Sequence, residues 1–225
     1  MKLRIRTYLI LAFIFVSVIP LAVFWSWPYS RILEAEKAEV RERHLLIAEN
    51  LASVLEHYHR DLVTALAAFR ESIEAGRGME ARTLFRNLSF RHICVADSVT
   101  GVVRSSYLTE EAPCPAEVPA KRLALFRELA ASSPPGVSRV FRPEGEKPRI
   151  FLASRSGDNL IVAAVYTDFF ERLRRQVRFG EDGHAAIVDQ TGGILAHPCS
   201  DTGKCIDNVG HLAPVERIRN GESGV

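Results

Sequence analysis

The feature that most constrains this chain is an uncharged, predominantly apolar run of twenty residues near its N-terminus, Tyr8 to Trp27. As a helix rising about 1.5 Å per residue, it would reach about 30 Å, the thickness of a bilayer's hydrocarbon core. We therefore predict a transmembrane anchor over residues 8–28. A cleaved signal peptide is the alternative. Its apolar region would be shorter and would end in small residues, whereas this run ends in Phe-Trp-Ser-Trp-Pro.

The charges that flank the anchor predict its orientation. Basic residues without an acidic one precede it, whereas the residues after it mix both signs. The positive-inside rule then places residues 1–7 in the cytoplasm and the bulk of the chain in the periplasm or outside the cell. The three basic residues are Lys2, Arg4 and Arg6, and the aromatic residues typical of an outer interfacial belt are Trp25, Trp27 and Tyr29.

The net charge of +2 indicates no acidic polymer as a partner. The densest basic run could suggest nucleic acid, but the predicted topology keeps it out of the cytoplasm. We predict a solvated helix face there and no nucleic-acid partner. The run consists of Arg172, Arg174, Arg175 and Arg178.

The four cysteines predict disulfides, because an even count in an oxidising compartment favours pairing. Cys199 and Cys205 flank a short polar segment that can bring their sulfurs together, so we predict a bridge between them. A zinc site with His197 and His211 is the alternative, but that spacing matches no common zinc pattern, and we predict no metal. The pairing of Cys94 with Cys114 stays open, because nothing local fixes their approach.

A long stalk helix is predicted over residues 29–78. Apolar residues recur at steps of three or four from Ser30 to about Ala75, which lines one face of a helix. Pro28 is expected to break the helix between anchor and stalk. Gly76 and Gly78 are expected to end it.

Beyond the stalk, a period of two predicts five strands with a helical excursion between the second and third. This pattern indicates an α+β fold with a PAS-like antiparallel sheet. Ser98 to Gly101 is a predicted turn, and Thr167 or Asp168 is expected to cap the last helix. The strands are His92–Asp97, Val102–Tyr107, Val137–Arg142, Arg149–Arg155 and Leu160–Tyr166, and the helices are Glu80–Leu88, Ala120–Ala131 and Thr167–Val177.

A second unit of the same style is predicted to begin near residue 179. It comprises a strand over Gly183–Asp189, a glycine turn, a strand over Ile194–His197 and a helix over Pro214–Asn220. Asp189 is expected to hydrogen-bond its own turn. A hairpin with one helix cannot bury a core of its own. We therefore expect the sequence to stop partway through a second module of a longer protein.

The segment Phe179-Gly-Glu-Asp-Gly-His-Ala-Ala-Ile-Val-Asp-Gln-Thr-Gly-Gly-Ile-Leu-Ala-His-Pro198 carries a family resemblance. It resembles the hairpin of the membrane-proximal module in double Cache sensor domains. The order of an anchor, a long outward helix, a distal PAS-like module and a proximal one is similar to that family too. The resemblance covers Tyr8 to Val225, and its specific motif is confined to Gly180–Pro198.

The resemblance implies an extracytoplasmic ligand-sensing input region of a membrane receptor. Residues 79–178 would form the distal module, where ligands of the family usually bind, and 179–225 the start of the proximal one. The cytoplasmic output would be a histidine kinase, a chemoreceptor coil or a diguanylate cyclase. Amino-acid-binding members carry an Arg-x-Trp-aromatic signature, which this sequence lacks, so amino-acid sensing is disfavoured.

Two groups of residues are candidates for binding a small ligand. We predict an anionic one, because four arginines lie on or beside the predicted strands: Arg104, Arg142, Arg149 and Arg155. In the first group, an arginine could hold a carboxylate bidentately. In the alternative reading of that group, Arg155 pairs with Asp168 or faces solvent, and Asp168 merely caps a helix. The first group is Arg155, Tyr166 and Asp168 at one predicted rim of the sheet, and the second is Arg104, Ser105 and Tyr107.

No catalytic motif suggests an enzyme: the sequence has no Gly-x-Ser-x-Gly, His-Glu-x-x-His or Gly-rich phosphate loop. No cofactor is predicted. A membrane-anchored scaffold without a small-molecule ligand is the competing function. A homodimer through the stalk helix would suit a sensor and a scaffold equally.

Overall fold

The computed structural model describes residues 5–76, 82–107, 114–132, 134–143, 146–179, 183–198 and 206–222. Of these it describes the backbone alone at 23–31, 82, 178–179 and 183–184. The chain divides into two compact units, residues 1–49 and residues 50–224. The domain boundaries drawn from the sequence stay predictions.

Helix α1 runs without a break from Ile5 to Glu74. The predicted break at Pro28 is therefore wrong. A proline removes one N–H donor, and a long helix can continue where the neighbouring turns keep their hydrogen bonds. The predicted end is confirmed, because Gly76 has φ 63°, a left-handed conformation that favours glycine and stops a helix. Gly78 lies outside the described residues.

The first unit contains one window, Ile5–Ala22 within α1, that is long and apolar enough to cross a membrane. None of that window is buried inside the protein. The exposed side chains include Leu9, Phe13 and Phe15. An exposed apolar surface of this kind is unfavourable in water and favourable in the hydrocarbon of a membrane. The side chains of the predicted aromatic belt, Trp25, Trp27 and Tyr29, lie outside the described part.

The second unit is built on a four-stranded antiparallel sheet with the order β2-β1-β4-β3. Helix α2 (Arg82–Asn87) precedes it, and helix α3 (Ala120–Ala131) lies between its second and third strands in the chain. The strands are β1 (Phe90–Asp97), β2 (Val103–Tyr107), β3 (Arg149–Ser156) and β4 (Asn159–Tyr166). The predicted fold class is confirmed.

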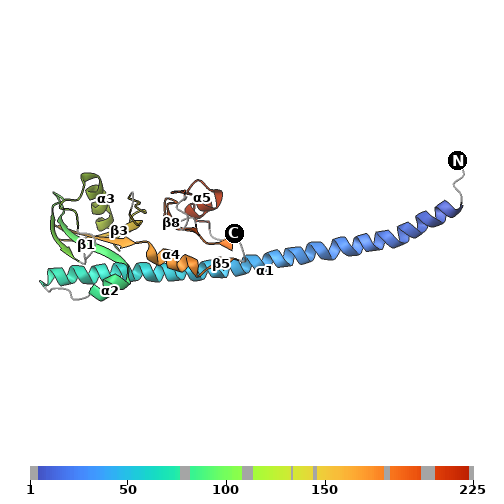
Figure 1. The fold of residues 1–225 in the computed structure, drawn as a ribbon, viewed down its shortest axis with the longest axis horizontal. Helices are drawn as coiled ribbons and strands as arrows, with labels where there is room; N and C mark the ends of the chain where they lie inside the picture. Colours follow the sequence, from blue (N-terminus) through green and yellow to red (C-terminus); the bar gives the residue numbers. More distant parts are fainter. Residues whose placement is uncertain are drawn as a thin grey trace. The chain divides into compact units, whose positions relative to one another are not determined.

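Helices cover both faces of this sheet (Figure 1). The C-terminal part of α1 packs on one face, where Leu62, Leu66 and Phe69 share a buried core with Ile93 and Leu152. Helix α3 packs on the other face. There Leu123 and Phe126 share a second core with Phe151, Leu160 and Val162. Because strands β1 and β4 are buried on both faces, their central residues, 93–96 and 160–165, are all apolar.

The predicted fifth strand, Val137–Arg142, is not a regular strand. It meets the edge of β3 through two isolated bridges, Val137 with Leu152 and Phe141 with Arg149. Between the bridges the Ser138 N–H donates to the Phe151 carbonyl, but the Phe151 N–H donates to the Ser138 hydroxyl instead of a carbonyl. The N–H of Val140 turns away to the Asp189 carboxylate. The sheet therefore has four strands rather than five.

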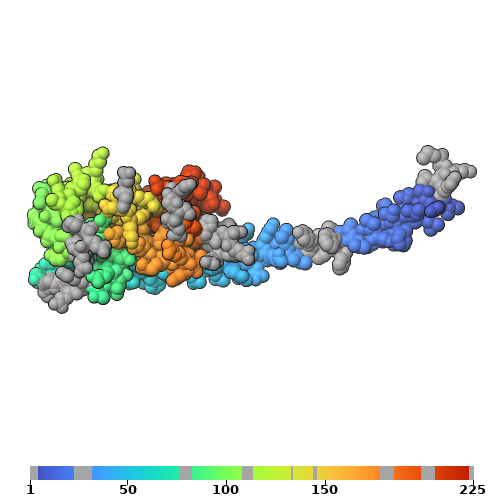
Figure 2. Space-filling model, viewed as in Figure 1, coloured from blue at the N-terminus to red at the C-terminus, as the bar shows by residue number. Residues whose placement is uncertain are grey.

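The predicted strand Gly183–Asp189 is divided in two, because its ends pair with different partners. Strand β6 (Gly183–His184) pairs with β5 (Arg178–Phe179), and β7 (Ile187–Val188) pairs with β8 (Ile194–Ala196). Helix α5 spans Ala213–Arg219. Figure 2 shows the red C-terminal part of the chain against its yellow and orange parts.

Asp189 joins the β7–β8 hairpin to the segment beside β3. Its Oδ1 accepts hydrogen bonds from the Thr191 and Gly193 N–H groups, each at 2.8 Å, which confirms the predicted turn. Its Oδ2 accepts one from the Val140 N–H at 2.8 Å. Burial alone would raise the pKa of Asp189, but these hydrogen bonds outweigh burial and the pKa is lowered. The ionised carboxylate is thus the form that holds the two segments together.

Helix α4 spans Asp168–Arg175, and Thr167 is its N-cap residue, as predicted. The Thr167 hydroxyl makes no capping hydrogen bond to the helix; it contacts the Pro148 carbonyl instead. The predicted solvated basic face is wrong at Arg174, which is buried and paired with Glu171 at 3.0 Å. A long side chain can bury its stem while its charge is neutralised by an acid one turn earlier.

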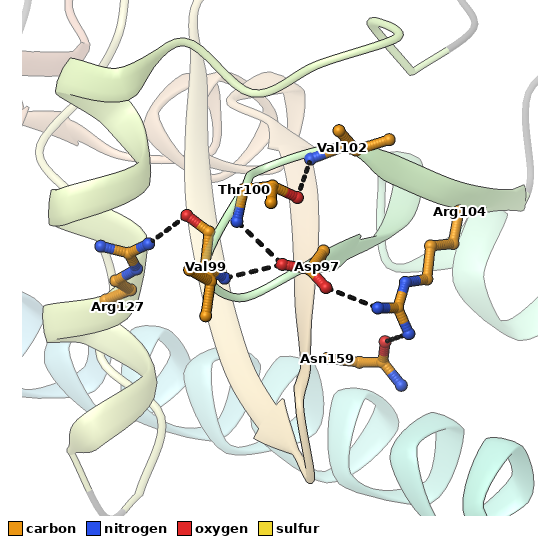
Figure 3. Close-up of polar contacts among 7 residues, drawn as sticks. All are labelled: Asp97, Val99, Thr100, Val102, Arg104, Arg127 and Asn159. Atoms are coloured by element: carbon orange, nitrogen blue, oxygen red, sulfur yellow. Dashed lines mark hydrogen bonds and ion pairs between the residues drawn. The ribbon is translucent and has the colours of Figure 1, made fainter.

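The turn between β1 and β2 is organised by Asp97 (Figure 3). Its Oδ1 accepts hydrogen bonds from the N–H groups of Val99 at 2.9 Å and Thr100 at 2.8 Å, while Oδ2 pairs with Arg104 at 2.5 Å. The backbone bonds from Thr100 and Val99, with a smaller contribution from Arg104, lower the pKa of Asp97 to about 2. Gly101 closes the turn with φ 80°.

We predict that Asp97→Ala lowers the melting temperature of the chain at pH 7, and that this difference shrinks as pH falls. The folded pKa is depressed, so the stabilisation is fully present above about 3.8 and is lost as pH falls through about 2. Thermal unfolding of both proteins in detergent between pH 7 and pH 2 measures this. Asp158→Ala, at an exposed carboxylate in the neighbouring turn, is the control. A pH-independent difference would contradict the assignment.

Candidate ligand-binding site

A cavity of about 260 Å³ lies between α3 and the face of the sheet that α3 covers. Its apolar lining includes Phe126, Phe151 and Val162. The segment from Pro115 to Pro119 forms part of its wall. Its polar lining is unusually basic and comprises Arg91, His92, Arg122, Glu146 and Arg149.

Strand geometry explains how these polar side chains reach the cavity. On β3, alternation places Arg149 and Phe151 on the α3 face and Ile150 on the α1 face. On β1, the pairing with β4 shifts register between Phe90 and His92. A bulge of this kind redirects a side chain. The consecutive residues Arg91 and His92 can therefore both line the cavity.

Two of the arginines share one carboxylate. Glu146 Oε2 lies 2.5 Å from Arg91 Nη1 and 2.8 Å from Arg149 Nη1. The side chains of Arg91 and Arg149 are 14% and 10% exposed, whereas that of Glu146 is 46% exposed. The Nε atoms of both arginines are buried without a hydrogen-bond partner in the described part of the chain. Both guanidinium groups thus retain unused donors.

Within the described residues, aromatic rings rather than an acid hold Arg122. Its guanidinium carbon lies 4.0 Å from the centroid of the Phe141 ring and 6.0 Å from that of Phe151. Arg149 lies over the same Phe141 ring, at 5.5 Å. Such cation–π contacts position a guanidinium without neutralising it. Three guanidinium groups therefore line the cavity with one carboxylate.

The Cys94–Cys114 pairing, which the sequence left open, is present as a disulfide with a Cα–Cα distance of 5.9 Å. Cys94 lines the cavity from β1, and Cys114 begins the segment that forms the cavity wall. The bond therefore ties that wall to the sheet. His92 lies close to both sulfurs, but a disulfide has no thiolate to offer a metal. The predicted Cys199–Cys205 bridge lies outside the described residues.

The first predicted site group is not brought together, and that expectation was wrong. Arg155 pairs with Leu160 and Tyr166 with Arg149, so Arg155 and Tyr166 lie at opposite ends of the β3–β4 hairpin. Antiparallel neighbours place their C-terminal ends at opposite edges, which the sequence argument overlooked. Arg155 is exposed and bonds the Gly157 carbonyl, while Asp168 pairs with Lys147 at 3.0 Å.

The second predicted group lies away from the cavity as well. Arg104 pairs with Asp97 and donates to Asn159 Oδ1 at 3.0 Å, so it supports the turn in Figure 3. Ser105 and Tyr107 share one face of β2, as parity predicted. Tyr107 packs edge-on against Phe69 of α1, on the face that α3 does not cover. Whether any residue of either group contacts a ligand stays a prediction.

Sequence reasoning missed Arg91, Arg122 and Glu146, although it counted Arg149 among the arginines beside the strands. Arg91 immediately precedes the predicted strand and reaches the cavity through the bulge in β1. Arg122 lies on a helix whose charged residues look like a solvated face. The available signal was weak. It was a basic residue in the first turn of an amphipathic helix that lies between two strands in the chain.

A second cavity of about 570 Å³ lies among α1, the segment from Pro134 to Ser138 and the β7–β8 hairpin. Its lining is mainly apolar and includes Leu55, Leu62 and Ile187. Its polar lining includes His59, Gln190 and Asp189, and the Asp189 carboxylate is already occupied by backbone N–H groups. Because charged groups converge only in the lining of the smaller cavity, where three arginines meet, that cavity is the better candidate for an anionic ligand.

No family model and no curated protein matches this chain. Among solved structures, the extracellular domain of the putative histidine kinase rpHK1S-Z16 is similar, with TM-score 0.57 at 13% identity over 82% of this chain and 79% of that one. The ligand-binding domain of Mlp24 with asparagine gives TM-score 0.51 at 19% identity, over 80% and 79%. The ligand-binding domain of the Pseudomonas aeruginosa PAO1 amino-acid chemoreceptor PctC, in complex with GABA, gives 0.50 at 18%, over 81% and 83%.

The chain has the fold of these extracellular ligand-binding domains. The predicted likeness to a double Cache sensor domain is thereby confirmed at the level of the fold. Identities of 13% to 19% carry no ligand from one protein to another.

We predict that replacing both Cys94 and Cys114 by serine lowers the free energy of unfolding by about 2–4 kcal/mol, because the unfolded chain gains freedom. Thermal unfolding of the 225-residue chain in detergent, under non-reducing conditions, measures the change. Replacing Cys199 and Cys205 by serine tests the separately predicted bridge and is measured beside it. Equal stability of the Cys94/Cys114 variant and the parent would contradict the structural role of this bridge.

Proposed function

We propose that this chain is the extracytoplasmic ligand-sensing input region of a membrane signal-transduction receptor, and that it binds a small anionic ligand in the basic cavity. The observation that carries the proposal is the convergence of Arg91, Arg122 and Arg149 in a partly apolar cavity. A fold shared with extracellular ligand-binding domains supports it. The output would be a histidine kinase, a chemoreceptor coil or a diguanylate cyclase.

The charge and size of the cavity select the kind of ligand. The two nearly buried guanidinium groups of Arg91 and Arg149 share a single carboxylate, so their charge is only partly compensated. An acidic ligand supplies the missing compensation, and an arginine binds a carboxylate through two parallel hydrogen bonds. At about 260 Å³ the cavity lies just below the range of about 300–1,000 Å³ for typical ligand pockets, so the ligand must be small.

The apolar helix supports a membrane location with the sheet outside the cytoplasm. The window Ile5–Ala22 has the length and composition of a span. The basic residues before it favour a cytoplasmic N-terminus. The Cys94–Cys114 disulfide also suits an oxidising compartment.

A route from the cavity to the long helix runs through three consecutive residues. Glu146 lines the cavity, Lys147 pairs with Asp168 at 3.0 Å, and the Pro148 carbonyl accepts a hydrogen bond from the Thr167 N–H at 3.3 Å. Asp168 lies in the first turn of α4. This short segment therefore connects the ligand site directly to α4.

Helix α4 in turn packs on α1. The Phe169 ring stacks on Tyr58 with centroids 3.7 Å apart, and Phe170 meets the same ring edge-on. Burial raises the pKa of Tyr58 to about 12, so its hydroxyl stays neutral and bonds the Leu88 carbonyl. A ligand signals only by favouring one arrangement over another. The α4–α1 contact is where such a preference would reach the helix that leads to the membrane.

The predicted topology can be tested with reporters fused after Val225 of the full chain. A reporter active only outside the cytoplasm should be active, and one active only in the cytoplasm should be silent, because the basic residues retain the N-terminus inside. Changing Lys2, Arg4 and Arg6 to glutamine is the control and should weaken this preference. Cytoplasmic activity of the parent fusion would contradict the proposed location.

The ligand site can be tested by titrating small carboxylates and phosphate into the full chain in nanodiscs, by calorimetry. We expect at least one anion to bind, and Arg122→Gln to weaken it about 10- to 100-fold, which corresponds to one charge-assisted interaction of about 1.5–3 kcal/mol. Arg155→Gln removes an exposed arginine outside the cavity and should leave the affinity unchanged. If Arg155→Gln weakened binding and Arg122→Gln did not, the cavity would not be the ligand site. If no anion bound, the scaffold function would be favoured.

A further inference from the structure

We propose that Glu146 is a built-in competitor for the ligand, and that the ligand is a small compound with two acidic groups. One acidic group replaces the Glu146 carboxylate between Arg91 and Arg149, and the other binds Arg122. The inference rests on the proposed function of the cavity, and it names both the ligand's chemistry and the residue that sets its affinity.

Glu146 holds the position that a ligand carboxylate would take. A single oxygen, Oε2, accepts from both Arg91 and Arg149, so one carboxylate bridges two nearly buried guanidinium groups. The glutamate itself is 46% exposed, which means that it enters from the solvent side. It can leave toward water without moving either arginine. The arginines then need another acid, because their charge remains buried.

The segment that carries Glu146 has contacts of its own that do not depend on the arginines. Lys147 is held by Asp168, and Pro148 by Thr167. Departure of the Glu146 side chain is therefore compatible with the fold. The same contacts would carry the change to the first turn of α4. Glu146 would thus couple occupancy of the cavity to the helix next to α1.

A tethered competitor predicts that one acidic group on the ligand is not enough. A tethered carboxylate acts at an effective concentration on the order of millimolar. A ligand with one carboxylate would replace the Glu146 carboxylate by an equivalent group and gain no additional interaction. Arg122 supplies the additional interaction, since in the described part of the chain its guanidinium contacts rings and no carboxylate. Two anion positions in a cavity of about 260 Å³ fit a short-chain dicarboxylate.

The opposite role for Glu146 makes the opposite prediction. In a site for a zwitterion, Glu146 would bind the ligand's ammonium group, and losing its charge would abolish affinity. In the competitor role, losing its charge frees the arginines and increases affinity. The sign of the change therefore separates the two mechanisms.

The experiment is calorimetry with the full chain in nanodiscs and three probes: succinate, its monoamide succinamate, and asparagine as a zwitterion. We expect succinate to bind more tightly than succinamate, and Glu146→Gln to tighten succinate binding about tenfold. Glu128→Gln changes an exposed glutamate on α3 and is the matched control for overall charge. An equal gain in that control would show a general electrostatic effect and overturn the inference.

Other results distinguish this inference from the proposed function. If asparagine binds, depends on Arg122 and is lost in Glu146→Gln, the competitor role is wrong while the cavity remains the ligand site. Succinate could bind neither the parent nor Glu146→Gln while another anion binds and requires Arg122. In that case the dicarboxylate assignment is wrong and the cavity remains the ligand site. If no anion binds any variant, both proposals fail.

Discussion

The burial of one sheet on both faces is the constraint on which the rest of this structure depends. Strands β1 and β4 lie in the middle, with α1 packed on one side and α3 on the other. Their central side chains are buried and apolar, so charged groups lie toward the strand ends and must find partners there. Arg149 begins β3, and Arg91 lies at the bulged start of β1. The basic cavity therefore lies where the burial of the sheet on both faces ends.

The same constraint explains how the cavity is linked to the remainder of the second unit. The irregular segment 137–142 lies along the edge of β3, and its consecutive residues face in different directions. Phe141 lies under Arg122 and Arg149, whereas Val140 and Arg142 bond Asp189 and the Ile194 carbonyl of the C-terminal hairpin. This segment is not a regular strand and meets β3 only through isolated bridges. Its irregularity connects the ligand site to the next element of the fold.

Pattern and length alone predicted most of the elements. Helix α3 has the predicted bounds, and the glycine turn at Gly101 and the end of α1 before Gly76 are as expected. Such features depend on interactions within a few residues. The errors arose where a residue had a distant partner. Val140 gave its N–H to Asp189, and residues 183–189 divided between two pairing partners. The cysteine pair that local spacing could not decide was joined by the approach of Cys114 to β1.

The sequence by itself determined the apolar helix, the fold class and the basic character of the chain around the sheet, because periodicity and composition are properties of neighbouring residues. Only the tertiary structure decided which arginines meet. Antiparallel pairing separated Arg155 from Tyr166 by the length of a strand, and a bulge and a helix brought Arg91 and Arg122 to Arg149. A binding site is made by residues far apart in the chain, and their approach is set by packing that no local pattern records.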